Sequence, residues 1–141
     1  ESGFLHWGHD ISPEENQYEA GLKFAISYKK NIDFIGKQSL LKIKEKKQKK
    51  KFIMLTLNDS QPGEPLMLHD EPIYLDGKII GRTTSGNYSF NFNKNLAFGY
   101  IKINEDTNDV KNKLVEVEIE KNKYKATILS KPLNQKDFKN S

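Results

Sequence analysis

The 141-residue sequence has no cysteine, a single tryptophan and a single arginine. The absence of cysteine excludes disulfide bonds, thiolate zinc sites and thiol nucleophiles. Because bidentate recognition of phosphate and guanine relies on arginine, a chain with only Arg82 is not expected to have a nucleic acid as partner. No run approaches the roughly 18 apolar residues of a membrane-spanning helix, and no basic-then-apolar leader pattern is present. We therefore expect a cytoplasmic protein with no membrane partner.

Positive charge is concentrated in one short stretch. The chain has 23 Lys and Arg against 19 Asp and Glu, a net charge of +4, and residues 42–51 hold seven Lys and one Glu. The rest of the chain then has 16 basic and 18 acidic residues, a net charge of −2. Such a stretch is typical of a solvated helix face that continues into a linker. The alternative, an RNA or phosphate contact, lacks the arginines and interleaved aromatic residues of such surfaces.

The first third of the chain gives mixed signals of local structure. Ser12, with Glu15 three positions later, matches a helix-start pattern, although Gly21 comes too soon for a long helix. Residues 22–28 alternate apolar and polar side chains and predict a strand. Residues 37–48 place Leu and Ile on one side and lysines on the others, which predicts a helix.

From residue 52 onward the pattern is that of an all-β unit. Apolar runs at 52–57 and 96–101 predict strands, and an Asp-Gly pair within 73–80 predicts a hairpin with a type I′ turn, whose two central residues need positive φ. The polar stretch 83–89 is expected to be a loop between strands. Five or six short strands with turn signals between them predict a small barrel or sandwich over about 52–131.

A second hairpin is predicted over residues 114–129. Val and Ile alternate with Glu in its first half, and Tyr, Ala and Ile alternate with polar residues, mostly Lys, in its second half. With the turn at 121–122, opposite charges lie across from each other, and each such pair contributes roughly 0.2–1 kcal/mol. The pairs expected in this register are Glu120 with Lys123 and Glu118 with Lys125.

One cluster contains residue types that bind metals. His6, His9 and Asp10 have the spacing of one helical face, but Gly8 between them favours a strand or a turn. A structural metal site also needs four ligands. We therefore expect no metal site and interpret the cluster as hydrogen-bonded packing beside Trp7. The sequence also contains no convincing nucleophile–base arrangement and no phosphate-binding glycine loop.

Several motifs follow one another in a defined order. They are His-Trp-Gly-His-Asp at 6–10, Tyr-Glu-Ala-Gly-Leu at 18–22, Asp-Phe-Ile-Gly-Lys at 33–37, Gly-Glu-Pro at 63–65, Gly-Arg-Thr-Thr-Ser-Gly-Asn-Tyr-Ser at 81–89 and Leu-Ala-Phe-Gly-Tyr-Ile at 96–101. In this order they resemble the second half of the aminomethyltransferase family, that is, the glycine cleavage T protein and its relatives. The match covers nearly the whole chain, and the ordered set is more specific than any single motif.

Two details are similar to one branch of that family, the folate-binding halves of dimethylglycine and sarcosine dehydrogenases. They are His-Trp-Gly-His at 6–9 and Glu-Pro-Ile-Tyr at 71–74. The plain T protein and a dimethylsulfoniopropionate demethylase are the alternatives. The resemblance implies tetrahydrofolate as cofactor, held in a central cavity where a one-carbon unit is transferred. In the dehydrogenase branch it also implies FAD, bound by an upstream domain that this chain does not contain.

The resemblance implies that Phe4 and Trp7 are cofactor-binding residues. Phe4 falls where the family often has a folate-facing Tyr, so stacking is retained without the hydroxyl, and Trp7 is expected to line the same wall. The alternative for both is packing in a core. The family's catalytic Asp and pterin-holding Glu lie before the matched region, so we assign no catalytic residue. Its C-terminal Arg has no clear match at 131–134.

The predicted fold class is α+β and mainly β: the tail of a folate-binding domain over 1–48, then a small antiparallel C-terminal β-barrel over 51–138. Glu19 and the stretch 85–89 are expected to be structural and to brace the barrel against the folate-binding domain. The parent polypeptide is expected to be an aminomethyl-transferring enzyme. The chain itself is expected to be an inactive C-terminal fragment, whose partners are folate and the N-terminal part of the same polypeptide. The alternative function is a non-catalytic barrel module that docks a partner protein or carrier.

Overall fold

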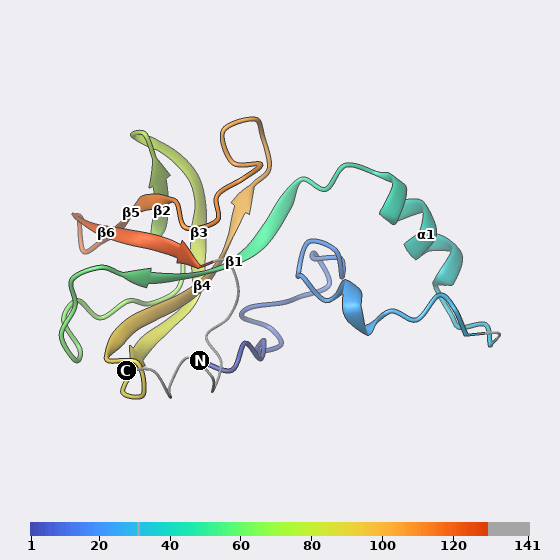
Figure 1. Cartoon of the computed structure of the whole chain (residues 1–141), viewed down its shortest axis with the longest axis horizontal. Helices are drawn as coiled ribbons and strands as arrows, with labels where there is room; N and C mark the ends of the chain where they lie inside the picture. The colour runs from blue at the N-terminus through green and yellow to red at the C-terminus, as the bar shows by residue number, and fades with distance from the viewer. Residues whose placement is uncertain (31, 130–141) are drawn as a thin grey trace.

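The computed structural model describes residues 1–30 and 32–129. A β-barrel forms its main body, a long N-terminal segment lies beside the barrel, and a helix lies at the end of an arm away from both (Figure 1). The last part of the expected barrel domain and the stretch 131–134 lie outside the described residues. The elements in chain order are the 3-10 helix η1 (Lys23–Ala25), the helix α1 (Lys37–Glu45) and the strands β1 (Lys50–Leu57), β2 (Pro72–Leu75), β3 (Lys78–Ser89), β4 (Lys94–Lys102), β5 (Leu114–Ile119) and β6 (Asn122–Leu129).

The six strands form a closed antiparallel barrel in the order β1-β4-β3-β2-β5-β6. Strand β1 closes it, because one edge of β1 pairs with β4 and the other with β6. Successive side chains of a strand point to opposite faces, so every second residue fills the interior. The interior side chains with almost no exposed surface include Leu55, Leu57, Ile73, Ile101, Val117 and Ile128. The predicted mainly β class and small antiparallel barrel are confirmed.

The outer faces of β1 and β4 are covered as well. Both strands have runs of consecutive buried residues, whereas a strand with one face in water would alternate. On this outer face the ring of Phe52 lies 5.0 Å from that of Phe98 and 5.4 Å from that of Tyr100, between centroids. The N-terminal segment, residues 1–30, contacts this layer through backbone and side-chain hydrogen bonds. Cover on both faces explains why 52–57 and 96–101 are almost continuously apolar.

The N-terminal segment is fastened at the start of β1. The Lys50 ammonium forms an ion pair with the Glu15 carboxylate and lies 5.1 Å from the centroid of the Tyr100 ring. Two residues along the strand, the Phe52 N–H donates to the Glu19 carbonyl oxygen over 2.7 Å. Burial by itself would raise the pKa of the Glu15 carboxyl, but its bonds to Lys50 and Ser12 outweigh burial and hold the pKa below its ordinary value. The two contacts fix the segment in register with β1.

The first predicted hairpin is confirmed. Leu75 pairs with Lys78, so Asp76 and Gly77 form a two-residue turn between β2 and β3. Their φ angles of 50° and 75° are both positive. Asp tolerates this region because its short polar side chain bonds locally, and Gly has no Cβ to clash. The turn chemistry alone was therefore sufficient to place this hairpin.

The second hairpin exists, but its predicted register was wrong by two residues. The turn is at Glu120-Lys121, and the strands pair Glu118 with Lys123 and Glu116 with Lys125. A shift of two leaves every side chain on its predicted face and still sets Glu opposite Lys. Neither pattern can therefore distinguish the two registers. The choice also depends on the pairing of β6 with β1, which the local sequence does not show.

Two further predictions about local structure were wrong. Residues 22–28 form no strand: η1 lies there, and none of the strands in the described part of the chain pairs with these residues. Residues 83–89 are not a loop but the second half of β3, which pairs with β4 as far as Ser89 and Lys94. The helix-start pattern at Ser12 forms its capping bonds, with the Ser12 N–H donating to the Glu15 carboxylate over 2.8 Å, but only turns follow.

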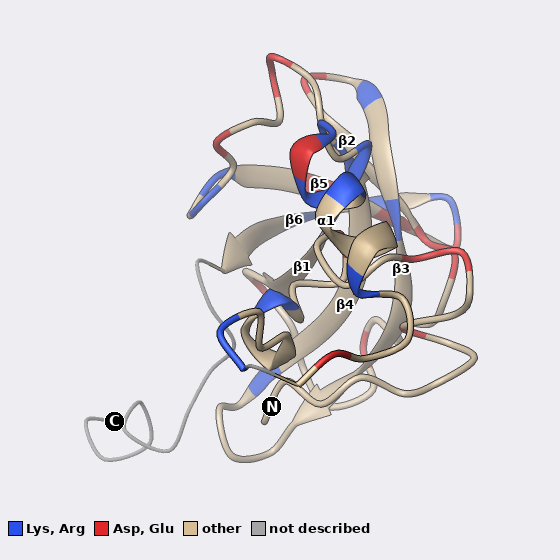
Figure 2. Cartoon of the chain, turned by 90° about the vertical axis from the view of Figure 1, so that its right-hand side faces the viewer, with Lys and Arg blue, Asp and Glu red and all other residues tan. Residues whose placement is uncertain are grey.

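Helix α1 confirms the predicted helix but ends three residues earlier than expected. After Glu45, the Gln48 side-chain amide donates to the carbonyl oxygens of Ile43 and Lys46 over 3.0 and 2.9 Å and so caps the helix end. No residue of α1 is fully buried. Lysines lie on the helix and on the chain that joins it to β1 (Figure 2). Within the charged stretch 42–51, Lys50 and Lys51 belong to the barrel as the first residues of β1.

We expect Gly81→Ala to lower the free energy of unfolding by about 2–3 kcal/mol, because overpacking in a dense core forces the backbone to move. A Cβ on Gly81 would lie 2.0 Å from the Tyr100 carbonyl oxygen of the paired strand β4. Urea denaturation followed by far-UV circular dichroism measures the change. Ile79→Ala, at an exposed position of the same strand, is the control and should cost about 0.5 kcal/mol. Equal losses in the two variants would contradict the expected clash.

We expect Lys50→Met to destabilise the protein by about 1–3 kcal/mol at pH 7, because it leaves the largely buried Glu15 carboxylate without its cation. The folded-state pKa of Glu15 is lowered, so its stabilisation is complete above the unfolded-state pKa and is lost as pH falls through the folded-state pKa. Urea titrations at several pH values should therefore show the difference between the two proteins shrinking as the pH falls below the ordinary Glu pKa of about 4.3. The exposed variant Lys47→Met should match the wild type throughout. A loss that does not depend on pH would contradict this account.

Candidate ligand-binding groove

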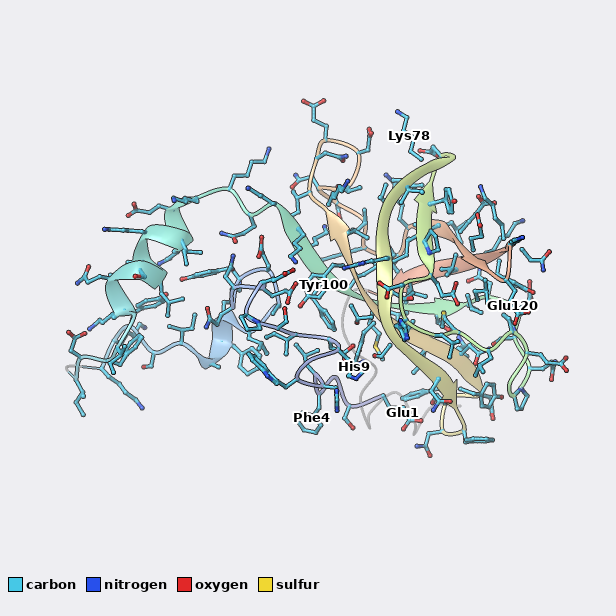
Figure 3. All side chains as sticks on the ribbon, turned by 180° about the vertical axis from the view of Figure 1, so that it is seen from behind. Glu1, Phe4, His9, Lys78, Tyr100 and Glu120 are labelled. Atoms are coloured by element: carbon cyan, nitrogen blue, oxygen red, sulfur yellow. The ribbon has the colours of Figure 1, made fainter. Side chains whose placement is uncertain are left out.

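A groove of about 860 Å³ lies between the N-terminal segment and the barrel. Phe4, Trp7 and Phe24 line it from the segment, and Phe52 with Met54 of β1 line it from the barrel. The predicted cofactor residues Phe4 and Trp7 therefore lie along one hollow. Phe4 lies near the lower edge of the molecule in Figure 3. This arrangement provides flat apolar surfaces on which a planar ring could stack.

The groove's aromatic side chains are not core residues. Phe4 is 88% exposed, Phe24 is 82% exposed and Trp7 is 66% exposed. Core packing of Phe4 and Trp7, the alternative raised from the sequence, is therefore not what the structure shows. Large apolar side chains gathered at one exposed place commonly mark a binding or interaction surface. A cofactor-binding role for the two residues remains a prediction.

The charged groups of the groove are all basic. Lys51 and Lys111 are part of its lining, and none of the described residues that line it is acidic. Burial lowers the pKa of Lys51; Asp109 opposes this effect and Lys111 adds to it. The Lys51 ammonium donates to the Asn108 carbonyl oxygen over 3.0 Å. The groove therefore combines aromatic walls with cations, which suits a flat ligand that carries a carboxylate.

Asp10 is a buried acidic residue of the N-terminal segment, three positions after Trp7. Its side chain is only 3% exposed and accepts hydrogen bonds from the hydroxyls of Thr84 and Ser85 over 2.6 and 2.7 Å. The Tyr100 hydroxyl donates to the Asp10 carbonyl oxygen over 2.9 Å. Burial, and after it the nearby carboxylates of Glu15, Asp10 and Glu19, raise the pKa of Tyr100, so its phenol remains a donor. The segment is thus held on the barrel by a second polar contact.

The end of β3 makes a third contact with the segment. The hydroxyl of Ser89 and the side-chain amide of Asn91 donate to the Glu1 carboxylate. These bonds lower the pKa of Glu1. Together with Ser85 on Asp10, they place the stretch 85–89 against the N-terminal segment, which agrees with the bracing role expected for it.

The histidine cluster does not form a metal centre among residues 1–30 and 32–129, where no group of three or more His, Asp or Glu side chains could hold an ion. The rings of His6 and His9 lie 4.8 Å apart between centroids. Asp10, the third member, directs its carboxylate at the hydroxyls of β3 instead. His69 lies elsewhere, beside Asp70 at 3.0 Å. The hydrogen bonds expected for the cluster are made by Asp10, while the Trp7 side chain beside it is mostly exposed.

Sequence reasoning missed several groove residues and the anchoring role of Asp10. Phe24 was assigned to a strand, and Lys51 to a solvated charge run. Lys111 belongs to a stretch with no recognised signal. A signal for Asp10 was present, since a lone carboxylate in an apolar stretch needs hydrogen-bond donors. In the part of the chain that the structure describes, no helix is long and apolar enough to cross a membrane.

Comparisons with known proteins agree with this architecture. Residues 50–134 match the family model of the glycine cleavage T-protein C-terminal barrel domain. A solved structure, the glycine cleavage system aminomethyltransferase T from Bartonella henselae, superimposes with a TM-score of 0.78 at 23% identity and covers 93% of this chain and 35% of that one. At this identity the likeness shows the shared fold.

Curated relatives are similar over nearly the whole chain. The mitochondrial dimethylglycine dehydrogenase of Rattus norvegicus is 39% identical over 135 residues, which are 94% of this chain and 15% of the relative. The aminomethyltransferase of Symbiobacterium thermophilum is 33% identical over 126 residues, which are 89% of this chain and 32% of the relative. The chain thus spans a third or less of either relative. The resemblance seen in the motifs is confirmed: this chain belongs to the family of the glycine cleavage T-protein C-terminal barrel domain.

Proposed function

We propose that this chain is the C-terminal part of a tetrahydrofolate-dependent aminomethyltransferase-like protein. In this proposal residues 1–48 complete a folate-binding domain and residues 51–138 are the C-terminal barrel. Support comes from the family match over 50–134 and from relatives named aminomethyltransferase and dimethylglycine dehydrogenase. The greater identity to the dehydrogenase supports the dehydrogenase branch, in which a separate domain of the longer polypeptide would bind FAD.

The observation that carries the proposal is the aromatic groove. Folate has a flat pterin, a benzoyl ring and a glutamate tail, so its rings match the walls formed by Phe4 and Trp7, and its carboxylates match Lys51 and Lys111. The two aromatic side chains would stack on the rings and exclude water from one side of the reacting carbon. The lysines would hold the tail as point charges. The chain's own contribution is therefore binding and orientation.

The exposed apolar surface supports a partner within the same polypeptide. Besides the groove aromatics, Ile32 and Ile35 on the arm before α1 are exposed. Surfaces of this kind are normally covered by another protein surface. In the proposal, the remaining part of the folate-binding domain covers them and completes the cavity. The competing function, a module that docks a separate protein or carrier, predicts no folate binding even in the longer polypeptide.

We expect this 141-residue chain to bind tetrahydrofolate with a Kd weaker than micromolar, since only one wall of the cavity comes from it. Isothermal titration calorimetry of the chain and of a longer polypeptide that contains it tests this directly. The longer polypeptide should bind at micromolar or lower Kd. Micromolar binding by the chain alone would show that the site needs nothing else, and no binding by the longer polypeptide would favour the docking module.

We expect Trp7→Ala and Phe4→Ala in the longer polypeptide each to raise the Kd for tetrahydrofolate about 2- to 12-fold, because an aromatic pair contributes about 0.5–1.5 kcal/mol beyond its buried area. Phe90→Ala is the matched control, since Phe90 is also an exposed aromatic but does not line the groove. It should leave the Kd unchanged. Unchanged affinity in both groove variants would remove Phe4 and Trp7 from the site.

A further inference from the structure

Trp7 is carried by a short turn, residues 6–11, which we call the Trp7 turn. The Gly8 N–H donates to the Ile11 carbonyl oxygen and the Asp10 N–H donates to the His6 carbonyl oxygen, each over 2.8 Å. Gly8 has a φ of 91°, a conformation that a residue with a Cβ adopts only under strain. The turn has its own backbone bonds, but these do not fix where it lies relative to the barrel.

A β-bulge in β3 lies directly under this turn. Thr83 pairs with Gly99 of β4 and Ser85 pairs with the adjacent Phe98, so Thr84 is an extra residue in the strand. In a regular strand two consecutive side chains point to opposite faces. A bulge redirects one of them. Thr84 and Ser85 can therefore present both hydroxyls on the same side of β3.

Both hydroxyls meet one oxygen of Asp10. The Thr84 and Ser85 hydroxyls donate to Oδ1 over 2.6 and 2.7 Å, and the His6 N–H donates to Oδ2 over 3.0 Å. No ion pair to Asp10 occurs among the residues that the structure describes. A buried carboxylate without a cation depends on directional donors for its stability. Its position is therefore set by the geometry of the bulge.

We infer that Asp10 is a positioning residue: the β3 bulge holds its carboxylate, and this holds the Trp7 turn at the edge of the groove. The His6 N–H, before Trp7, donates to the Asp10 carboxylate. The Asp10 carbonyl oxygen, after Trp7, accepts from the Tyr100 hydroxyl of β4. Rotation of the turn about either end would therefore break one of these two hydrogen bonds. The barrel thus positions the turn that carries the indole through β3, a strand none of whose residues lines the groove. Only the naming of tetrahydrofolate as the ligand rests on the proposed function.

The chain's single tryptophan makes the inference measurable without any ligand, because all indole fluorescence comes from Trp7. The test variant is Thr84→Val with Ser85→Ala, which removes both hydroxyls from the barrel and leaves the turn unchanged. The control is Thr127→Val, which removes a hydroxyl that bonds Asn58 over 2.8 Å on β6. Time-resolved fluorescence anisotropy reports local motion of the indole on the nanosecond scale.

We expect the sub-nanosecond share of the anisotropy decay to rise about twofold in the double variant and to stay unchanged in the control. If the double variant does not fold, as judged by circular dichroism, Asp10→Asn is used as the test variant instead. The side-chain oxygen of the introduced amide can still accept from the two hydroxyls. Its NH₂ group, however, would face the His6 N–H, and two donors cannot bond each other, so this variant should also free the indole. Unchanged Trp7 motion, or an equal rise in Thr127→Val, would overturn the inference.

A second experiment measures the binding of tetrahydrofolate to the longer polypeptide. The double variant should raise the Kd about 3- to 10-fold in the wild-type background and have no further effect in a Trp7→Ala background, since the two changes act through one side chain. An additive effect in that background would overturn positioning through Trp7. If the hydroxyl variants free the indole but neither they nor Trp7→Ala change folate affinity, Trp7 is no folate contact while the positioning stands; the proposed function itself fails only if the longer polypeptide does not bind tetrahydrofolate.

Discussion

Closure of the barrel through β1 is the constraint on which the other contacts depend. Because β1 pairs with β4 and β6, it has no free edge, and its register is fixed from both sides. Its inner face supplies core residues such as Leu55 and Leu57. Its outer face and its first residues hold the N-terminal segment, through Lys50 to Glu15 and through Phe52 to Glu19. The position of the groove therefore follows from the position of this one strand.

Local signals in the sequence predicted the fold wherever the physical cause was local. The Asp76-Gly77 turn was placed correctly because its backbone requirement is met by the two residues themselves. Residues 22–28 alternate like a strand but pair with none of the strands that the structure describes, and pairing is a property of the whole fold. The second hairpin was shifted by two residues because both side-chain face and charge repeat with that period.

The candidate site was predictable only in part, for a similar reason. Phe4 and Trp7 could be named through a family resemblance, and the structure brings them to one groove. Lys51 and Lys111 join them only because the segment packs across β1. Thr84 and Ser85 are separated from Asp10 by 74 and 75 residues, and a bulge in β3 aims them at it. No local pattern encodes a contact that depends on an irregularity in one strand and on a turn far away in the sequence.

The Lys-rich linker between α1 and β1 contributes a side-chain hydrogen bond to the N-terminal segment, from the Asn16 amide to the Gln48 side-chain oxygen over 3.0 Å. Lys46, Lys47 and Lys49 are exposed there, while most of the attachment is made by contacts outside the linker. Asp10, Glu15 and Glu1 bind strands β1, β3 and β4 or the turn beside them without using the connecting chain. A protease that cuts after these lysines would therefore convert one chain into two tightly associated pieces. Covalent continuity at this place raises the local concentration of the segment, and complementarity of the two surfaces determines its position.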